Sequence, residues 1–136
     1  MEIEKLLTTT LTSSPITHFR LKQLSEMAQC TEDHISRLAL GISIRNGIVG
    51  ADWMPDSDVF INDETGDFNE KQIRGSTLFK GEVELWTALV LTHQSPSDYS
   101  NLREVFISHW ERGVEELYTI SKEEDDWLRV LNRCME

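Results

Sequence analysis

The sequence has little of what marks secreted or membrane proteins. Only two of its 136 residues are cysteine, and Cys30 and Cys134 lie far apart without metal-ligand spacing. We therefore expect free thiols in a reducing cytoplasm. No apolar run approaches the roughly 18 residues that a membrane-spanning helix needs. The first fifteen residues lack a basic stretch before a long apolar core, so we expect neither a signal peptide nor a membrane anchor.

Basic residues are also scarce. Thirteen Lys and Arg against 24 Asp and Glu give a net charge of −11, which argues against a general nucleic-acid binder. The excess of acidic over basic residues is distributed unevenly along the chain. Residues 15–50 carry a net charge of +1, residues 52–70 hold seven acidic side chains and no Lys or Arg, and residues 81–136 carry −7. A DNA-contacting face is therefore expected in the first half or near residues 71–80. The acidic C-terminal half is expected to face away from DNA or toward a basic partner.

Hydrophobic periodicity predicts a mainly α-helical protein with one compact domain over residues 15–136, after a flexible segment over residues 1–14. About five helices are expected, over residues 23–30, 32–45, 82–93 and 97–118, and from Ser121 onward. Thr31 and Asn46-Gly47 delimit the second helix, and Ser121 with Glu124 forms a capping box for the last. An alternating pattern predicts a short extended segment over residues 16–22, and a loop or small hairpin is expected over residues 55–70.

The stretch Gln72–Glu82 joins the acidic loop to the most hydrophobic segment of the chain. Gly75 permits a positive φ, and the hydroxyls of Ser76 and Thr77 favour a turn. Arg74 beside exposed backbone N–H groups also suits an anion, so both a structural turn and an anion site stay open.

The segment Val83–Leu91 that follows is apolar on almost every side. Such a helix is typical of a central position or an oligomer interface. The residues expected on its most buried face, and hence in the candidate oligomer interface, are Leu85, Trp86, Leu89 and Val90.

Two parts of the chain resemble the DndE family of the DNA phosphorothioation system, in which sulfur replaces a backbone oxygen of DNA. The matching residues are 23–31, then 36–40 and 43–44, and above all 73–79 (IRGSTLF) followed by Gly81. The resemblance covers roughly residues 18–93 and leaves residues 95–136 as additional C-terminal helices. It implies a small, mainly α homotetramer that binds double-stranded, particularly nicked, DNA beside sulfur-transfer and ATPase partners. DNA contact in the family is attributed to surface lysines, of which this chain has few.

Together these observations predict an accessory subunit of DNA phosphorothioation, without catalytic residues, cofactor or metal, that contacts DNA or its partner enzymes. The candidate DNA- or phosphate-binding residues are Arg20, Lys22, Arg37, Lys71, Arg74, Ser76, Thr77 and Lys80.

Two other functions stay open. A strand over residues 16–22 would place His18, Arg20 and Lys22 on one side, as in a dimeric ribbon-helix-helix repressor that reads DNA with a β-ribbon. A protein–protein adaptor without DNA contact suits the charge of −11. For three further groups of side chains we expect a structural or solvated role. Each group lacks a feature that its chemistry would need, namely a third metal ligand, a catalytic partner or the spacing of a calcium-binding loop. These groups are Cys30 with His34, His93 with His109, and Asp63, Glu64 and Asp67.

Overall fold

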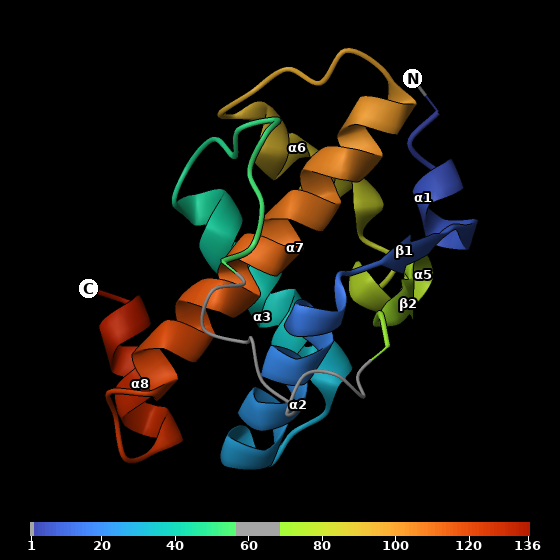
Figure 1. Cartoon of the computed structure of the whole chain (residues 1–136). Coiled ribbons are helices and arrows are strands. Elements are labelled where there is room, and N and C mark those ends of the chain that lie inside the picture. Colours follow the sequence, from blue (N-terminus) through green and yellow to red (C-terminus); the bar gives the residue numbers. More distant parts are fainter. Residues whose placement is uncertain (1, 57–68) are drawn as a thin grey trace.

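The computed structural model describes residues 2–56 and 69–136 (Figure 1). The longer helices are α2 (Pro15–Ala28), α3 (Glu32–Arg45), α6 (Val83–Leu91), α7 (Tyr99–Ser121) and α8 (Trp127–Cys134). The short elements are α1 (Lys5–Thr8), β1 (Thr10–Thr12), β2 (Gln72–Arg74) and α5 (Gly75–Leu78). The predicted mainly helical fold is confirmed. Among the described residues, no helix is long and apolar enough to cross a membrane. The hairpin expected within residues 55–70 lies largely outside the described residues.

The long helix α7 is the element on which the others pack. Figure 1 shows it crossing the molecule, with α2 and α3 lying against it. Asp98 caps its start by accepting a hydrogen bond from the Asn101 N–H at 2.8 Å. Its buried residues recur at helical spacing and form the centre of the core: Leu102, Val105, Phe106, His109, Trp110, Gly113, Val114 and Leu117.

Helix α3 begins and ends where the sequence predicts. Thr31 Oγ1 accepts a hydrogen bond from the His34 N–H at 3.2 Å, and Gly47 follows the helix with a φ of 102°. The buried residues of α3 face α7, and the two helices approach so closely at Ala39 that only a glycine fits at position 113. A Cβ there would lie 1.9 Å from the Ala39 carbonyl oxygen.

Residues 16–22 are helical, so the predicted extended segment is wrong. Pro15 occupies the first turn of α2, where its fixed φ suits the helix and its missing N–H is not needed. The alternating pattern spans too few residues to separate a strand from a helix. His18, Arg20 and Lys22 therefore do not share one side of a strand, which removes the basis of the ribbon-helix-helix alternative.

A carboxylate from α7 secures the start of α2. Glu111 Oε1 accepts hydrogen bonds from the Ser14 N–H at 2.6 Å, the Ser14 hydroxyl at 2.6 Å and the Thr17 hydroxyl at 2.9 Å. A negative group at a helix N-terminus is favourable because it meets unsatisfied N–H groups and the positive end of the helix dipole. Sequence reasoning missed this contact because its partners are almost a hundred residues apart.

The N-terminal residues are packed into the core, where we expected a flexible segment. β1 pairs with β2 in antiparallel register, with Leu11 opposite Ile73. Leu6 and Leu11 are fully buried. Burying apolar side chains of this size stabilises the folded chain by about 2 kcal/mol each, which accounts for the docking of so short a segment.

The C-terminal helices differ from the prediction at their junction. α7 continues through Ser121, whose hydroxyl donates to the Tyr118 carbonyl at 2.6 Å. Asp126 caps α8 by accepting from the Arg129 N–H at 3.1 Å. The predicted capping box of Ser121 and Glu124 is therefore wrong, because the preceding helix still includes Ser121.

Candidate nucleic-acid interface

The single turn α5 is held against the N-terminal segment by backbone contacts. The Gly75 N–H donates to the Thr9 carbonyl at 2.9 Å, and a Cβ on Gly75 would lie 1.6 Å from the Leu6 carbonyl oxygen. Gly75 does not adopt the positive φ that a glycine permits; in this segment a positive φ occurs at Lys80 and Gly81, with φ of 52° and 78°. Glycine is required at position 75 for close approach, and its N–H is occupied by protein rather than open to an anion.

Apolar side chains fix the other side of α5. Leu78 and Phe79 are fully buried. The Phe79 ring packs edge-to-face against Phe106 of α7, with ring centroids 4.8 Å apart. The polar side of this turn is thus presented to solvent on a rigid support.

Cations and hydroxyls gather around this exposed side. Arg37 of α3 donates from Nη1 to the Thr77 carbonyl at 2.9 Å, which brings a second element to the turn. Arg74, Ser76, Thr77 and Lys80 are exposed, and Arg37 is half-buried. We call these residues the α5 cluster: Arg37, Arg74, Ser76, Thr77 and Lys80.

The local charge of this surface is opposite to that of the whole chain. The α5 cluster contains three basic side chains, Arg37, Arg74 and Lys80, and no acidic one, whereas the chain carries −11. Five of the eight predicted DNA-binding residues therefore meet on one surface, although they come from α3, β2, α5 and the residues that follow α5.

The other three predicted residues lie elsewhere. Arg20 is only 3% exposed, because its guanidinium lies 3.2 Å from Glu115 Oε1 and donates to the Asp56 carbonyl at 2.6 Å. The structure therefore removes Arg20 from the candidate interface. Lys71 is half-buried beside acids at the start of α3, with Nζ 3.4 Å from Glu32 Oε1. Lys22 is exposed on α2, on a different element from the α5 cluster.

No protein-family model, curated protein or solved structure matches this chain. The functional argument therefore depends on its own residues and their arrangement.

The residues predicted to form an oligomer interface separate into covered and exposed groups. Val90 is 1% exposed and belongs to the core of its own subunit, and Trp86 is half-buried. Leu85 and Leu89 are 56% and 40% exposed, so the expectation that they lie on the most buried face of α6 is wrong within one subunit. The side of α6 that faces the core carries Val83, Thr87 and Val90.

A buried polar network at the contact of α3 and α7 escaped sequence reasoning. Arg112 donates from Nε to the Ser43 hydroxyl oxygen at 2.8 Å, and that hydroxyl lies 2.8 Å from His109 Nδ1. Because Ser43 Oγ accepts from the arginine, its own hydrogen is available to His109. The Arg112 guanidinium also donates to the carbonyls of Ser43, Gly47 and Ile48 at 2.7–2.8 Å. It thereby satisfies carbonyl groups at the end of α3 and just beyond it.

This arrangement keeps His109 neutral. The pKa of His109 is lowered to about 4, chiefly by burial and in addition by the nearby charges of Arg112 and His93. Ser43 and His109 are 0% and 1% exposed, so a substrate has no access to them in this structure. Their hydrogen bond joins α3 to α7 inside the core.

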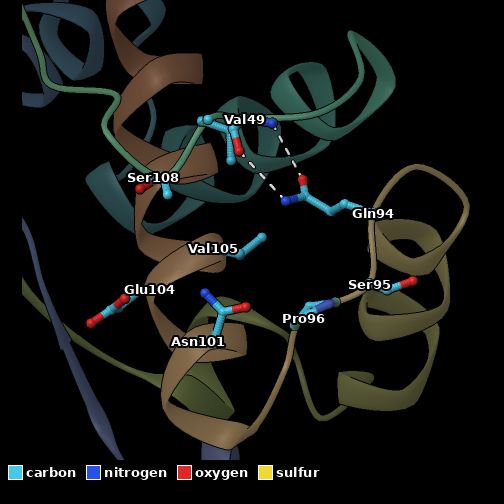
Figure 2. A pocket seen from close by; sticks show the side chains of 10 residues that line it. Val49, Gln94, Ser95, Pro96, Asn101, Glu104, Val105 and Ser108 are labelled. Atoms are coloured by element: carbon cyan, nitrogen blue, oxygen red, sulfur yellow. Dashed lines mark hydrogen bonds between the residues drawn. The ribbon is translucent and has the colours of Figure 1, made fainter.

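A small pocket beside the connection between α6 and α7 has a cavity of about 160 Å³ (Figure 2). Gln94 spans its edge: its Oε1 accepts from the Val49 N–H at 3.3 Å, and its Nε2 donates to the Val49 carbonyl at 3.5 Å. Asn101 Oδ1 accepts from the Ser97 N–H at 3.0 Å. The side-chain amides of Gln94 and Asn101 join neighbouring segments of the chain. Among the described residues that line the pocket, only Glu104 is charged. We therefore assign no ligand to this pocket.

No group of three or more His, Cys, Asp or Glu side chains that could hold a metal ion occurs within residues 2–56 and 69–136. Asp63, Glu64 and Asp67, which we considered for calcium, lie outside the described residues.

Proposed function

We propose that this chain is a non-catalytic accessory subunit of DNA sulfur modification that works in the cytoplasm and contacts the DNA backbone through the α5 cluster. One observation carries the proposal. The segment on which the resemblance to the DndE family mainly rests, residues 73–79, forms most of β2, all of α5 and Phe79. It presents the exposed side chains of Arg74, Ser76 and Thr77, and Arg37 of α3 is bonded to the Thr77 carbonyl.

The chemistry of the cluster suits phosphate rather than bases. Arg74 and Lys80 are exposed cations, and Ser76 and Thr77 add neutral hydrogen-bond donors. Arg37 is oriented by its bond to Thr77 and keeps further guanidinium donors for a phosphate oxygen. Contacts of this kind position a protein on DNA without reading sequence. The acidic remainder of the chain repels DNA and so restricts contact to this side.

The double substitution Arg74→Ala with Lys80→Ala tests the proposed contact. We expect at least a tenfold loss of affinity for nicked and intact duplex at low salt, because two phosphate contacts are removed. The slope of log K against log salt should become shallower by about 2. Fluorescence anisotropy with a labelled duplex measures both quantities.

The matched control is Lys122→Ala with Arg129→Ala, which makes the same change in net charge in the C-terminal part of the chain. An equal loss in both variants would show that overall charge, and not the α5 cluster, governs binding. If the unaltered protein does not bind duplex at low salt, the adaptor without DNA contact becomes the better description.

We also propose that copies of the chain assemble through the exposed side of α6. Leu85 and Leu89, which lie one helical turn apart, are 56% and 40% exposed, although the helix as a whole is among the most apolar parts of the sequence. Large exposed apolar patches are rare on monomeric proteins. The homotetramer implied by the resemblance requires such a surface.

Light scattering on Leu85→Asn with Leu89→Asn tests the assembly. We expect an oligomer for the unaltered protein and a monomer for the variant at the same concentration, because two exposed leucines lose their apolar contact. Leu128→Asn is the control, since Leu128 is 72% exposed on α8 and away from α6. A monomeric unaltered protein, or dissociation caused by the control, contradicts assembly through α6.

A further inference from the structure

Helix α8 carries more apolar surface than its own chain covers. Val130 and Cys134 are buried, whereas Leu128 and Met135 are 72% and 77% exposed. On a helix of 3.6 residues per turn, Leu128, Leu131 and Met135 lie on one side, next to the buried residues. The apolar side of α8 therefore extends beyond the part that is buried against the rest of the chain.

This exposed side is presented by a helix with a fixed position. Val130 and Cys134 insert into the core, and Arg45 of α3 donates a hydrogen bond from its guanidinium to the Cys134 carbonyl. Asp126 caps the first turn. The exposure of Leu128 and Met135 is thus part of the packed arrangement and not the result of an undocked chain end.

The charge around these apolar residues is negative. Four consecutive acids occupy positions 123–126, and residues 123–136 hold five acidic and two basic side chains, a net charge of −3. Both arginines are already paired with this acidic turn: Arg133 Nη1 lies 2.6 Å from Glu123 and 3.3 Å from Glu124, and Arg129 Nε lies 3.7 Å from Asp126. A partner that approaches α8 therefore meets apolar side chains beside a net negative charge.

We propose that this α8 surface, formed by Leu128, Leu131, Met135 and the acidic turn 123–126, binds a basic amphipathic helix of another protein. Such a helix supplies apolar anchors at spacings of three, four and seven residues, with Lys or Arg beside them. A second copy of this chain suits the surface poorly, because symmetric pairing of α8 would oppose two regions of net charge −3. DNA and anionic lipid are repelled for the same reason.

The location of this surface allows it to act independently of the α5 cluster. Figure 1 shows α8 at one end of the molecule and β2 with α5 near the other side. A partner on α8 therefore leaves the proposed DNA-contacting surface accessible. The inference rests on α8 alone and does not depend on the proposed function.

Two synthetic helical peptides with the same leucine positions test the proposal, one with lysine and one with glutamate at the remaining positions. We expect the full-length protein to bind the lysine peptide with micromolar affinity and the glutamate peptide at least tenfold more weakly. The double substitution Leu128→Asn with Met135→Gln should weaken binding of the lysine peptide at least tenfold, because the leucines of the peptide lose their apolar contacts on α8. Anisotropy of labelled peptides measures these affinities, and circular dichroism checks that the variant is folded.

The control is Leu85→Asn with Leu89→Asn, which removes two exposed leucines from α6 and should leave peptide binding unchanged. Equal binding of the lysine peptide by the α8 variant and the unaltered protein would overturn the proposal. So would equal binding of the two peptides, or no binding at peptide concentrations up to about 1 mM. A change of oligomeric state in the α8 variant would instead identify a second copy as the occupant.

Discussion

Replacing Gly113 by alanine is expected to lower the free energy of unfolding by about 3 kcal/mol, at the upper end of typical overpacking costs. The new Cβ would stand 1.9 Å from the Ala39 carbonyl oxygen and 2.5 Å from its carbonyl carbon. These are backbone atoms of α3, so rotation of a side chain cannot relieve the overlap. The two central helices must move apart, and the core between them loses its close packing. Urea unfolding measures the loss.

Gly41→Ala is the matched control because it also places alanine inside one of the two central helices. Its Cβ would lie 3.7 Å from Trp86 Cη2, an ordinary van der Waals distance. We expect no loss and a gain of up to about 1 kcal/mol, since alanine favours a helix interior over glycine. Similar stability for Gly113→Ala and Gly41→Ala would show that α3 and α7 can separate without cost, which contradicts the close contact.

Local signals were sufficient for α3 and for the start of α7. Thr31 and Gly47 mark the two ends of α3, and the polar residues that end in Asp98 predict the start of α7. Helix ends can be predicted in this way because capping residues and hydrophobic spacing act within a few residues. Over residues 16–22 the spacing of apolar residues was ambiguous between a strand and a helix, because seven residues complete only about two helical turns. The contact with Glu111, which secures the start of α2, comes from a distant part of the sequence.

The candidate interface could be predicted in part. Residue types and the resemblance selected eight residues, and five of them meet around α5. Sequence reasoning could not exclude Arg20, because its ion pair joins it to Glu115, 95 positions away. Nor could it show that Arg37 meets Thr77, 40 positions away. Electrostatic partners of this kind are set by the tertiary fold and leave no local pattern.

The side of α6 that faces the core could not be predicted from the sequence, for a different reason. Apolar residues occupy nearly its whole circumference, so hydrophobic spacing does not choose one side. The side that faces the core includes the polar Thr87 between Val83 and Val90, while Leu85 and Leu89 face outward. Packing of the whole domain selects this orientation, and it leaves both leucines exposed.

Lowering the pH from 7 to 4 is expected to destabilise the protein by about 3 kcal/mol through His109 alone. The pKa of this histidine is about 4 in the folded protein, against an ordinary value of 6.5. Between these values the unfolded chain binds more protons than the folded one. Stability is therefore complete above pH 6.5 and falls as the pH drops toward 4, by about 1.4 kcal/mol per unit.

The network around His109 explains why protonation is unfavourable in the folded state. A protonated ring carries a hydrogen on Nδ1 and can no longer accept the Ser43 hydroxyl, which already accepts from Arg112. The new positive charge would also lie in the core close to the Arg112 guanidinium. Both effects act on the contact between α3 and α7, so the loss of stability should be global.

Urea unfolding of His109→Asn at several pH values between 7 and 4.5 isolates this contribution. Asparagine offers an acceptor to Ser43 but does not titrate, so the variant should be less stable at neutral pH and should show a shallower dependence on pH. The difference in slope is expected to approach 1.4 kcal/mol per pH unit near pH 5. His34→Asn, which alters an exposed histidine of α3, should keep the slope of the unaltered protein. If the free energy of unfolding depended on pH equally in His109→Asn and the unaltered protein, protonation of His109 would not be the cause of the loss of stability.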